Sequence, residues 1–587
     1  MKRIFYLVVV LFMALTVNAS DFKFDWGHMY DGKGAGDTPI AMSKATDGNY
    51  YCLLAWCADA GEKSLFYDGE KLTDTKGEVI EGADGTVGNM VLQKLNAETG
   101  KPLWTIYSNS GYVYQTSCNV KATSDGGAIA LFMVRNWSNP SVVMNVVDAA
   151  GAQHSVTWEN NGHNVYFPIA MKVDADGNVK WMKQLFTFTY VDGLKYFPCN
   201  LYYSNDMELD ENDNIYIGGS FYSTINFKKA NGEEEHITAK NVVNWDGDVQ
   251  AVNGDLYLAK FDKDGNYIQN LTAEGTAVAA NIAKMEIHNG VIYAEGRIRG
   301  DGTEMSLGGK AFTPATSQSI FFTSINANDF SVNYARMFNS AVPDSKEGVH
   351  PKAIQYLNDN VYLIGSVQSG SFLDGDNTLF PLSAGGYTGV MIKCEPATGN
   401  LIAAGMYKEA ISEAFGVVET KDTLANNEVV DSVLLYGYNM FNGYFMASFS
   451  QEGKFFIQNG EKILINYGTV ASSAPLLVDG KSVIMLNRGG RNGTSGLLAH
   501  FYGTDYTLAN LHGWSVLVSK FTNNSIYTKT GDVAGIDAVE NADNKLHNYN
   551  VYNFNGTLVK KANSMDNAVE GLSKGFYIIG NKKIIVK

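Results

Sequence analysis

Short stretches of alternating apolar and polar residues recur along most of the chain, and turns rich in Asp, Asn and Gly separate them. Typical stretches are YYCLLAW (50–56), AIALFMV (128–134) and VIYAEGRI (291–298). Runs of β-branched and aromatic residues of this length, bounded by such turns, predict β-strands. We therefore expect an all-β body between about residues 22 and 530.

Two phrases repeat within this body. The first is a turn followed by an aromatic strand, as in KATDGNYYCLLAW, ELDENDNIYIGGSF and QYLNDNVYLIGSV. The second is a strand, a turn and a strand, as in LQKLNAETGKPLW, AMKVDADGNVKW and LAKFDKDGNYIQ. Together they give units of four antiparallel strands, A to D, with Asp-Gly or Asn-Gly turns in A–B and C–D. About seven such units predict a seven-bladed β-propeller, with six or eight blades left open.

The register within the second phrase is regular, and it extends to the N-terminal strand. The glycines of the C–D turns precede a fixed strand position by four residues, for example Gly100 before Trp104 and Gly177 before Trp181. Trp26 lies 78 residues before Trp104. FKFDWG (22–27) therefore matches a fourth strand that lacks its own first three. We expect it to complete the last blade and so remove a free sheet edge.

Long insertions fall almost entirely between strands B and C, at about 57–88, 135–164, 222–253, 299–318 and 368–387. Strand parity places all of them on one face of the propeller, and binding residues tend to lie on loops carried by a rigid scaffold. Aromatic side chains beside amides suit a glycan or a protein partner. The alternative is an extra hairpin that packs its own tryptophan inward. The candidate ligand-binding residues are Trp137, Trp158, His163, Tyr166, Trp245 and Tyr387.

No catalytic, metal or cofactor motif is found. DADGN (174–178) and DKDGN (262–266) resemble the start of a calcium loop, but the twelfth positions are Leu185 and Ala273 instead of Glu. We interpret both as hairpin turns. The five cysteines lack a CxxC pair, which argues against zinc, and we expect buried thiols more than a bridge between Cys52 and Cys57.

Charge and the N-terminal segment bear on destination. The formal net charge is −16, which argues against nucleic acid and anionic membrane surfaces as partners. Residues 1–19 combine Lys2 and Arg3, a short apolar run and small residues before Ser20. This pattern predicts a cleaved signal peptide rather than a membrane anchor, because the apolar run is short for a span. We expect a secreted or cell-surface protein.

Two phrases carry a resemblance to known propellers. LNAETGKPLW resembles the quinoprotein-type propeller repeat, and AMKVDADGNVKW resembles the β-propeller repeats of secreted bacterial proteins. Quinone enzymes of that kind place adjacent cysteines beside the cofactor, and no two cysteines are adjacent here. The resemblance therefore implies the fold and no cofactor.

The pattern changes after residue 530. Residues 531–544 are polar and small, as in a linker, and 545–587 hold seven Lys against two acids. VYNFNGTLVKK, GLSKGFYII and the final KKIIVK resemble the C-terminal sorting domain of the type IX secretion system of Bacteroidetes. The resemblance implies export across the outer membrane through the secretion machinery, and a small β-module that caps the propeller is the alternative. The motif positions are Asn555, Gly556, Leu572, Gly575, Tyr577 and Lys587.

Three functions remain open at this point. The first is a binding protein for a glycan or an extracellular protein, with no enzymatic activity. The second is a propeller-type glycoside hydrolase or lyase, with carboxylates gathered near the central channel. The third is a structural surface protein without a discrete ligand. Concentrated acids and histidines facing the channel favour the second, and a connected aromatic patch on the face with the insertions favours the first.

Overall fold

The computed structural model divides into two compact units, Met1–Tyr527 and Thr528–Lys587, which we describe separately. No helix in the described residues is long and apolar enough to cross a membrane. The predicted signal peptide (1–19) and linker (531–544) lie outside those residues. The structure describes residues 22–34, 36–59, 61–83, 88–110, 113–135, 141–159, 166–189, 206–221, 224–239, 255–275, 279–300, 302–340, 348–368, 371–374, 377–381, 387–409, 411–423, 429–439, 443–466, 476–489, 498–501, 504–507, 515–523, 549–553, 558–562, 571–579 and 582–586.

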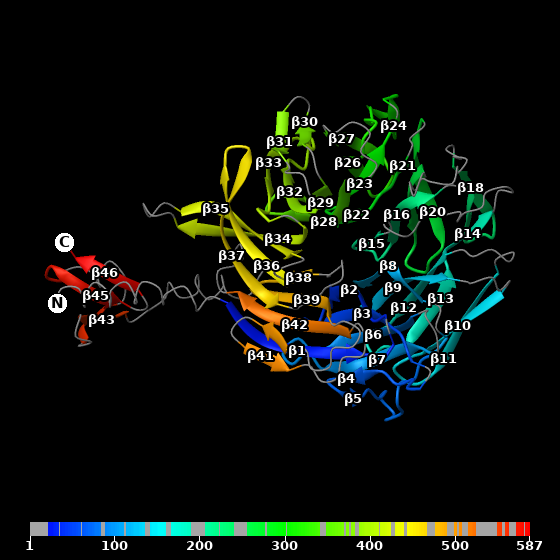
Figure 1. Cartoon of the computed structure of the whole chain (residues 1–587), viewed down its shortest axis with the longest axis horizontal. Coiled ribbons are helices and arrows are strands. Elements are labelled where there is room, and N and C mark those ends of the chain that lie inside the picture. The colour runs from blue at the N-terminus through cyan, green and yellow to red at the C-terminus, as the bar shows by residue number, and fades with distance from the viewer. Residues whose placement is uncertain are drawn as a thin grey trace. The chain divides into compact units, whose positions relative to one another are not determined.

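The first unit consists of antiparallel sheets that follow one another around a centre (Figure 1). One run of four strands, from an innermost to an outer strand, recurs in these sheets; the ten-stranded sheet contains two such runs, and the small sheet β14-β17-β18 contains none. The innermost strands contact one another in chain order around the ring. They are β2 (Thr38–Lys44), β8 (Val113–Ala122), β15 (Asp206–Leu209), β22 (Lys284–His288), β28 (Val349–Leu357), β34 (Ser412–Thr423) and β38 (Leu476–Asp479).

The second strands pair with the innermost ones and are largely buried. They are β3 (Tyr50–Trp56), β9 (Ala128–Arg135), β16 (Ile215–Phe221), β23 (Val291–Arg299), β29 (Asn360–Gln368), β35 (Val429–Asn439) and β39 (Ser482–Gly489). The third strands are β6 (Asn89–Leu95), β12 (Tyr166–Val173), β19 (Asp255–Phe261), β26 (Ser319–Asn326), β32 (Tyr387–Cys394), β36 (Gly443–Glu452) and β42 (Ser515–Asn523).

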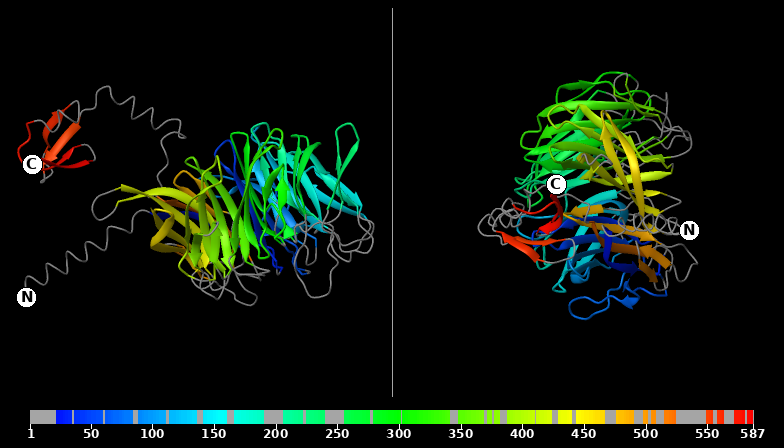
Figure 2. Two further views of the ribbon diagram at one scale, coloured as in Figure 1. Left: turned by 90° about the horizontal axis from the view of Figure 1, so that it is seen from above. Right: turned by 90° about the vertical axis from the view of Figure 1, so that its left-hand side faces the viewer.

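The fourth strands form the outer part of the ring. They are β7 (Pro102–Ser108), β13 (Val179–Gln184), β20 (Tyr267–Glu274), β27 (Val332–Ser340), β33 (Leu401–Met406), β37 (Phe455–Asn466) and β1 (Phe22–Asp31). β14 (Phe186–Thr189) continues the line of β13 after Leu185, and β21 (Ala279–Ala280) pairs with β23. The architecture is that of an all-β, propeller-like body, and Figure 2 shows its sheets from two further sides.

The N-terminal strand closes the ring, as its sequence predicts. β1 pairs antiparallel with β42, from Phe22 opposite Asn523 to Tyr30 opposite Val516. The first strand of the body thus joins β38, β39 and β42, which come from the end of the body, in one sheet. In Figure 1 the blue β1 lies beside the orange β42.

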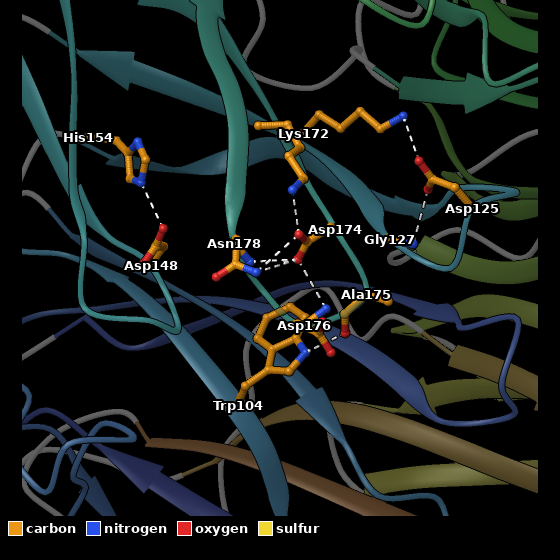
Figure 3. Close-up of polar contacts among 11 residues, drawn as sticks. Trp104, Asp125, Gly127, Asp148, His154, Lys172, Asp174, Ala175, Asp176 and Asn178 are labelled. Atoms are coloured by element: carbon orange, nitrogen blue, oxygen red, sulfur yellow. Dashed lines mark hydrogen bonds and ion pairs between the residues drawn. The ribbon is translucent and has the colours of Figure 1, made fainter.

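The Asp-Gly motifs are hairpin turns. The Asp174 carboxylate accepts hydrogen bonds from the backbone nitrogens of Asp176 (3.1 Å) and Asn178 (2.8 Å), and it pairs with the Lys180 ammonium at 2.6 Å. Figure 3 shows this turn. Asp262 binds its own turn in the same way. Each of these carboxylates accepts hydrogen bonds from its own turn, which confirms the prediction of hairpin turns at both motifs.

The four-residue register has a physical cause at the junctions between sheets. Trp104 of β7 donates from Nε1 to the carbonyl oxygen of Ala175 in the next C–D turn, at 3.0 Å (Figure 3). A Cβ atom on Gly177 would lie 2.8 Å from the Trp104 ring. Gly177 also has φ of 83°, a conformation that favours glycine. Trp26 makes the same kind of contact with Gly100. Each junction of this kind therefore needs the ring on one sheet and the glycine on the next.

The insertions between second and third strands contain β-hairpins. Each hairpin below comes from an insertion between a second and a third strand. All but one pair with the outer strand of the preceding sheet, and the exception, β17 with β18, pairs with β14, which follows the outer strand β13. The reason is that an outer strand leaves backbone groups unpaired until another strand binds them. The hairpins are β4 (Phe66–Tyr67) with β5 (Glu70–Lys71), β10 (Ser141–Val147) with β11 (Gln153–Glu159), β17 (Thr224–Lys228) with β18 (Glu234–Thr238), β24 (Met305–Leu307) with β25 (Lys310–Phe312), β30 (Ser371–Asp374) with β31 (Asn377–Pro381), and β40 (Leu498–Phe501) with β41 (Thr504–Thr507).

The apolar core lies mainly between neighbouring sheets. One cluster joins Leu53 and Leu92 of the sheet begun by β2 to Val120 and Phe132 of the next sheet. Cys52, Cys57 and Cys394 are buried, and none of the three forms a disulfide bond. The bridge between Cys52 and Cys57 is therefore absent, as expected.

The second unit contains one four-stranded antiparallel sheet in the order β44-β43-β45-β46. Tyr577 is buried, pairs with Asn553, and donates from its hydroxyl to the Ser573 carbonyl oxygen at 3.0 Å. Leu572 is half-buried and precedes β45, and Gly575 pairs with Val586. Asn555, Gly556 and Lys587 lie outside the described residues. The strands are β43 (Tyr549–Asn553), β44 (Leu558–Ala562), β45 (Gly575–Ile579) and β46 (Lys582–Val586).

Candidate functional site

The predicted ligand-binding residues fall in three groups. Trp137, His163 and Trp245 lie outside the described residues. Trp158 lies on β11, opposite Val142, and Tyr166 opens β12, opposite Arg135, so these two belong to different sheets. The side chains of Trp158 and Tyr166 are not among those described. Tyr387 is the one predicted residue whose side chain is described.

Tyr387 opens β32 and lies beside polar residues at the starts of two innermost strands. Its ring centroid is 4.3 Å from that of His350, the second residue of β28. The Lys352 ammonium lies 3.2 Å from Oε2 of Glu413, the second residue of β34. Nδ1 of His350 lies 4.0 Å from Oε1 of the same carboxylate. We refer to His350, Lys352, Tyr387 and Glu413 as the strand-start cluster.

The negative charge of this cluster depends on the ionisation of Glu413. Burial opposes ionisation of the Glu413 carboxyl, but His350 and Lys352 outweigh that effect and lower its pKa. The three charged or titratable side chains keep part of their surface exposed, 30% for His350, 19% for Lys352 and 15% for Glu413. The cluster therefore presents an ionised carboxylate, an ammonium and two aromatic rings within reach of a ligand.

This combination suits a polar ligand with an apolar face. The rings of Tyr387 and His350 offer stacking surface, while Lys352 and Glu413 offer a donor and an acceptor. Pockets that orient small polar ligands combine such surfaces with a few placed polar groups. The cluster lies at the strand ends that face the B–C insertions, which is the face predicted from strand parity.

A second polar set lies on three adjacent innermost strands: Asn119 and Lys121 of β8, Asp206 and Glu208 of β15, and Lys284 and Glu286 of β22. We refer to these six residues as the inner belt. Lys121 pairs with Glu208, and Asn119 donates to Asp206 at 2.7 Å. Lys284 lies 3.8 Å from Asp206.

Two carboxylates of the belt accept hydrogen bonds from the backbone of a neighbouring strand. Asp206 accepts from the backbone nitrogen of Met285 at 2.9 Å, and Glu286 accepts from that of Tyr356 at 2.8 Å. In both cases the donor belongs to the next innermost strand around the ring. An innermost strand has a sheet edge whose N–H groups need partners. These side chains supply them and tie neighbouring sheets together.

Two belt carboxyl groups nevertheless have unusual acidity. Burial raises the pKa of Glu286 to about 7, against a smaller lowering by the Tyr356 N–H, and the charge of Glu208 adds to the rise. Burial also raises the pKa of Glu208 to about 7, although Lys121 lowers it. A carboxyl group in this range can act as a general acid near neutral pH. The raised pKa values of Glu208 and Glu286 are therefore compatible with general-acid chemistry in the belt.

Other candidate sites in the described part of the chain are weaker. No group of three His, Cys, Asp or Glu side chains in that part could hold a metal ion. A hollow of about 400 Å³ lies on the flank between β25, β27 and the turn at Gly399, with Arg336 and Asp374 in its lining. Its aromatic lining residues, Phe312 and Phe338, are buried and offer no stacking surface.

The sequence interpretation missed His350, Lys352 and Glu413. A signal was present, because His350 and Lys352 alternate at the start of a predicted innermost strand, where side chains two apart share a face. The predicted binding residues lie in or beside the B–C insertions, whereas His350, Lys352 and Glu413 follow the D–A connections. Glu413 could not be paired with them from sequence, since more than 60 residues separate it from both.

No family model matches the chain, and no curated protein matches it. Among solved structures, the chain is similar to the quinohemoprotein alcohol dehydrogenase from Comamonas testosteroni, at 11% identity and a TM-score of 0.35, over 88% of this chain and 79% of that one. It is also similar to xylan beta-1,4-xylosidase from Bacillus halodurans C-125, at 8% identity and 0.25, over 86% and 96%.

A third similar structure is a europium-containing methanol dehydrogenase, at 11% identity and a TM-score of 0.31, over 86% of this chain and 94% of that one. Likeness at this level says nothing about activity. The architecture described above rests on the strand pairing of the chain itself.

Proposed function

We propose that the first unit is a seven-bladed β-propeller. The support is the recurrence of one four-strand order, from the sheet begun by β2 to the sheet in which β1 completes β38, β39 and β42. The outer hairpins are additions to these blades. The second unit is, in this proposal, a sorting module of the type IX kind, and its support is the sequence resemblance of residues 545–587.

We propose that the protein is a secreted or cell-surface binding protein whose ligand is a glycan or an extracellular protein. The observation that carries this proposal is the strand-start cluster, in which the ring of Tyr387 lies against His350 beside the Lys352–Glu413 pair. It combines stacking surface with a charged donor and acceptor, on the face that carries the insertions. The proposal includes no catalysis and no cofactor.

A glycan array with the mature protein tests this, followed by titration of the best ligand against two variants. Tyr387→Ala removes a ring from the cluster, and we expect it to weaken binding by about 1–3 kcal/mol, the scale of a lost aromatic contact with its burial. Tyr356→Ala is the matched control. Its ring stacks on His288 with centroids 3.8 Å apart, at the opposite end of β28. Equal losses in both variants, or turnover of the ligand, would contradict the proposal.

The inner belt favours a second candidate, a hydrolase that uses Glu208 or Glu286 as an acid. The observation behind it is the raised pKa of both groups. A polysaccharide-hydrolysis screen tests it, with Glu286→Gln as the variant, since glutamine keeps an acceptor for the Tyr356 N–H. Released sugar that disappears in this variant supports the hydrolase, and absence of product with every polysaccharide supports the binding protein.

The proposed role of the C-terminal module in export is tested separately. Deletion of residues 545–587 is expected to leave the first unit folded and to retain the protein inside the cell envelope. A marked fall in the melting temperature of the first unit after this deletion would indicate a structural module instead.

A further inference from the structure

The hollow on the flank of the first unit is lined by residues from two of the added hairpins. Its volume of about 400 Å³ falls within the range of about 300–1,000 Å³ that is typical of sites for small molecules. The lining comes from β27, from the end of the β24–β25 hairpin, from Asp374 at the end of β30, and from the C–D turn at Gly399. Segments that are distant in the sequence thus meet around one space of ligand size.

Arg336 of β27 lines this hollow with a guanidinium group that the protein holds in place. Its Nε donates to the carbonyl oxygen of Thr398 at 3.0 Å, and its Nη2 donates to Oδ1 of Asn400 at 2.6 Å. These two bonds use one edge of the planar group and fix its orientation. Within the described part of the chain, no carboxylate forms an ion pair with Arg336. The other edge of the guanidinium is therefore available to a ligand.

The propeller repeat does not require an arginine at this place. Arg336 is the sixth residue after Phe330, the positive-φ residue that precedes β27. The corresponding residues of the first and third blades, counted from Gly100 and Gly265, are apolar, namely Ile106 and Leu271. The guanidinium is thus a feature of this blade, and the fold alone does not explain it.

The other polar groups of the hollow can both donate and accept hydrogen bonds. They are the amides of Asn339 and Asn400 and the hydroxyl of Thr313, and the carboxyl group of Asp374 adds an acceptor. Ligand hydroxyl groups need such a mixture, because each of them donates and accepts. The aromatic lining residues are buried, so hydrogen bonds and not ring stacking must hold the ligand. A guanidinium edge binds a carboxylate through two parallel hydrogen bonds.

We propose that the flank hollow is a second binding site, which takes a small hydroxylated carboxylate of the uronic acid type. Arg336 binds the carboxylate, and the two amides and Thr313 bind the hydroxyl groups. None of the four residues of the strand-start cluster lines the hollow. The second site therefore goes beyond the proposed function and does not depend on it.

Calorimetric titration of the mature full-length protein with glucuronate tests this, with glucose as the neutral counterpart. The titration is run at 0.15 M salt, which screens the net charge of −16 beyond about 8 Å. Glucuronate is expected to bind at least about tenfold more tightly than glucose, because glucose lacks the charged partner of Arg336. Absence of glucuronate binding, or equal affinity for the two sugars, would overturn the proposal.

Two variants assign the binding to the hollow. Arg336→Met is expected to weaken glucuronate binding at least about tenfold, since both bonds to the carboxylate are lost. Arg299→Met is the matched control, because Arg299 also donates from Nε to a backbone carbonyl, that of Thr316 at 2.8 Å, but does not line the hollow. Its affinity is expected to equal that of the wild type. Equal losses in the two variants would contradict the assignment.

A measurement on the wild type does not depend on a variant that folds. Phenylglyoxal modifies accessible guanidinium groups, and peptide mass spectrometry gives the rate for each arginine. Glucuronate is expected to slow the modification of Arg336 and to leave that of Arg299 unchanged. An unchanged rate at Arg336 would overturn the proposal. Tyr387→Ala is expected to keep its affinity for glucuronate, whereas a loss would place this ligand at the strand-start cluster and refute a second site.

Discussion

Replacement of Gly177 by alanine tests the junction between blades most sharply. Gly177 has φ of 83°, and an added Cβ would lie 2.8 Å from the Trp104 ring and 2.7 Å from the Ala149 methyl group. The left-handed backbone costs an alanine about 1–2 kcal/mol. Overpacking against a ring held by its neighbours adds about 1–3 kcal/mol. We therefore expect Gly177→Ala to lower the free energy of unfolding by about 2–5 kcal/mol.

Gly48→Ala is the matched control for this change. Gly48 has φ of 86°, but no atom lies within 4 Å of the position of its added Cβ. Gly48→Ala should therefore lower the free energy of unfolding only by the cost of the left-handed backbone, about 1–2 kcal/mol. Urea unfolding midpoints of the two variants and the wild type measure the difference.

A double-mutant cycle then assigns the difference to the ring. In a Trp104→Leu background the collision with the ring is relieved and the one with the Ala149 methyl group remains. Gly177→Ala should therefore cost less than in the wild-type background, with a coupling of up to about 3 kcal/mol. Equal losses for Gly177→Ala and Gly48→Ala in the wild-type background would refute the reasoning, because they would show that the tryptophan and the glycine do not depend on one another.

The remaining predictions concern titration, thiol access and closure. Burial raises the pKa of Glu286 from its ordinary value of 4.5 to about 7 in the folded protein, so its contribution to stability is present below about pH 4.5 and is lost as pH rises to about 7. Glu286→Gln should flatten this fall by up to about 3 kcal/mol in melting experiments across that range, and an unchanged pH profile would contradict it. Burial raises the pKa of the Cys52 thiol to about 12, so iodoacetamide at pH 8 should modify Cys52 only after urea is added, as peptide mass spectrometry would show; rapid modification of the native protein would disprove its burial. Deletion of residues 22–31 should expose the edge of β42 and give soluble aggregates by light scattering, whereas a stable monomer would show that β1 is dispensable.

The repeat could be predicted from the sequence because the blades share one local pattern of strands and turns. Gly100, Gly177, Gly265 and Gly399 all have positive φ, and that need is visible as a conserved spacing within the chain itself. The role of β1 was predictable for the same reason, since Trp26 stands in the register of Trp104. The predicted positions of these strands agree with the pairing of β1 and β42.

The additions to the blades were harder to predict. For the insertion at 135–164 the sequence left an extra hairpin open as the alternative, and β10 and β11 form that hairpin. Its attachment to β7 of the preceding blade could not be predicted, because the partner strand lies outside the unit that carries the insertion. Pairing across units leaves no local sequence signal. The strand-start cluster was also hard to predict, since His350 and Tyr387 come from two strands of one blade that are separated by β29, and Glu413 comes from the innermost strand of the next blade. Residues that share a site through ring geometry cannot be grouped by spacing.

Hydrogen-exchange footprinting of the mature protein with its best array glycan tests the central claim most directly. We predict that bound glycan protects the starts of β28, β32 and β34, around His350, Tyr387 and Glu413, while mass spectrometry finds the glycan intact. Protection confined to the C–D turns at the opposite ends of the strands, or a cleaved glycan, would contradict the account.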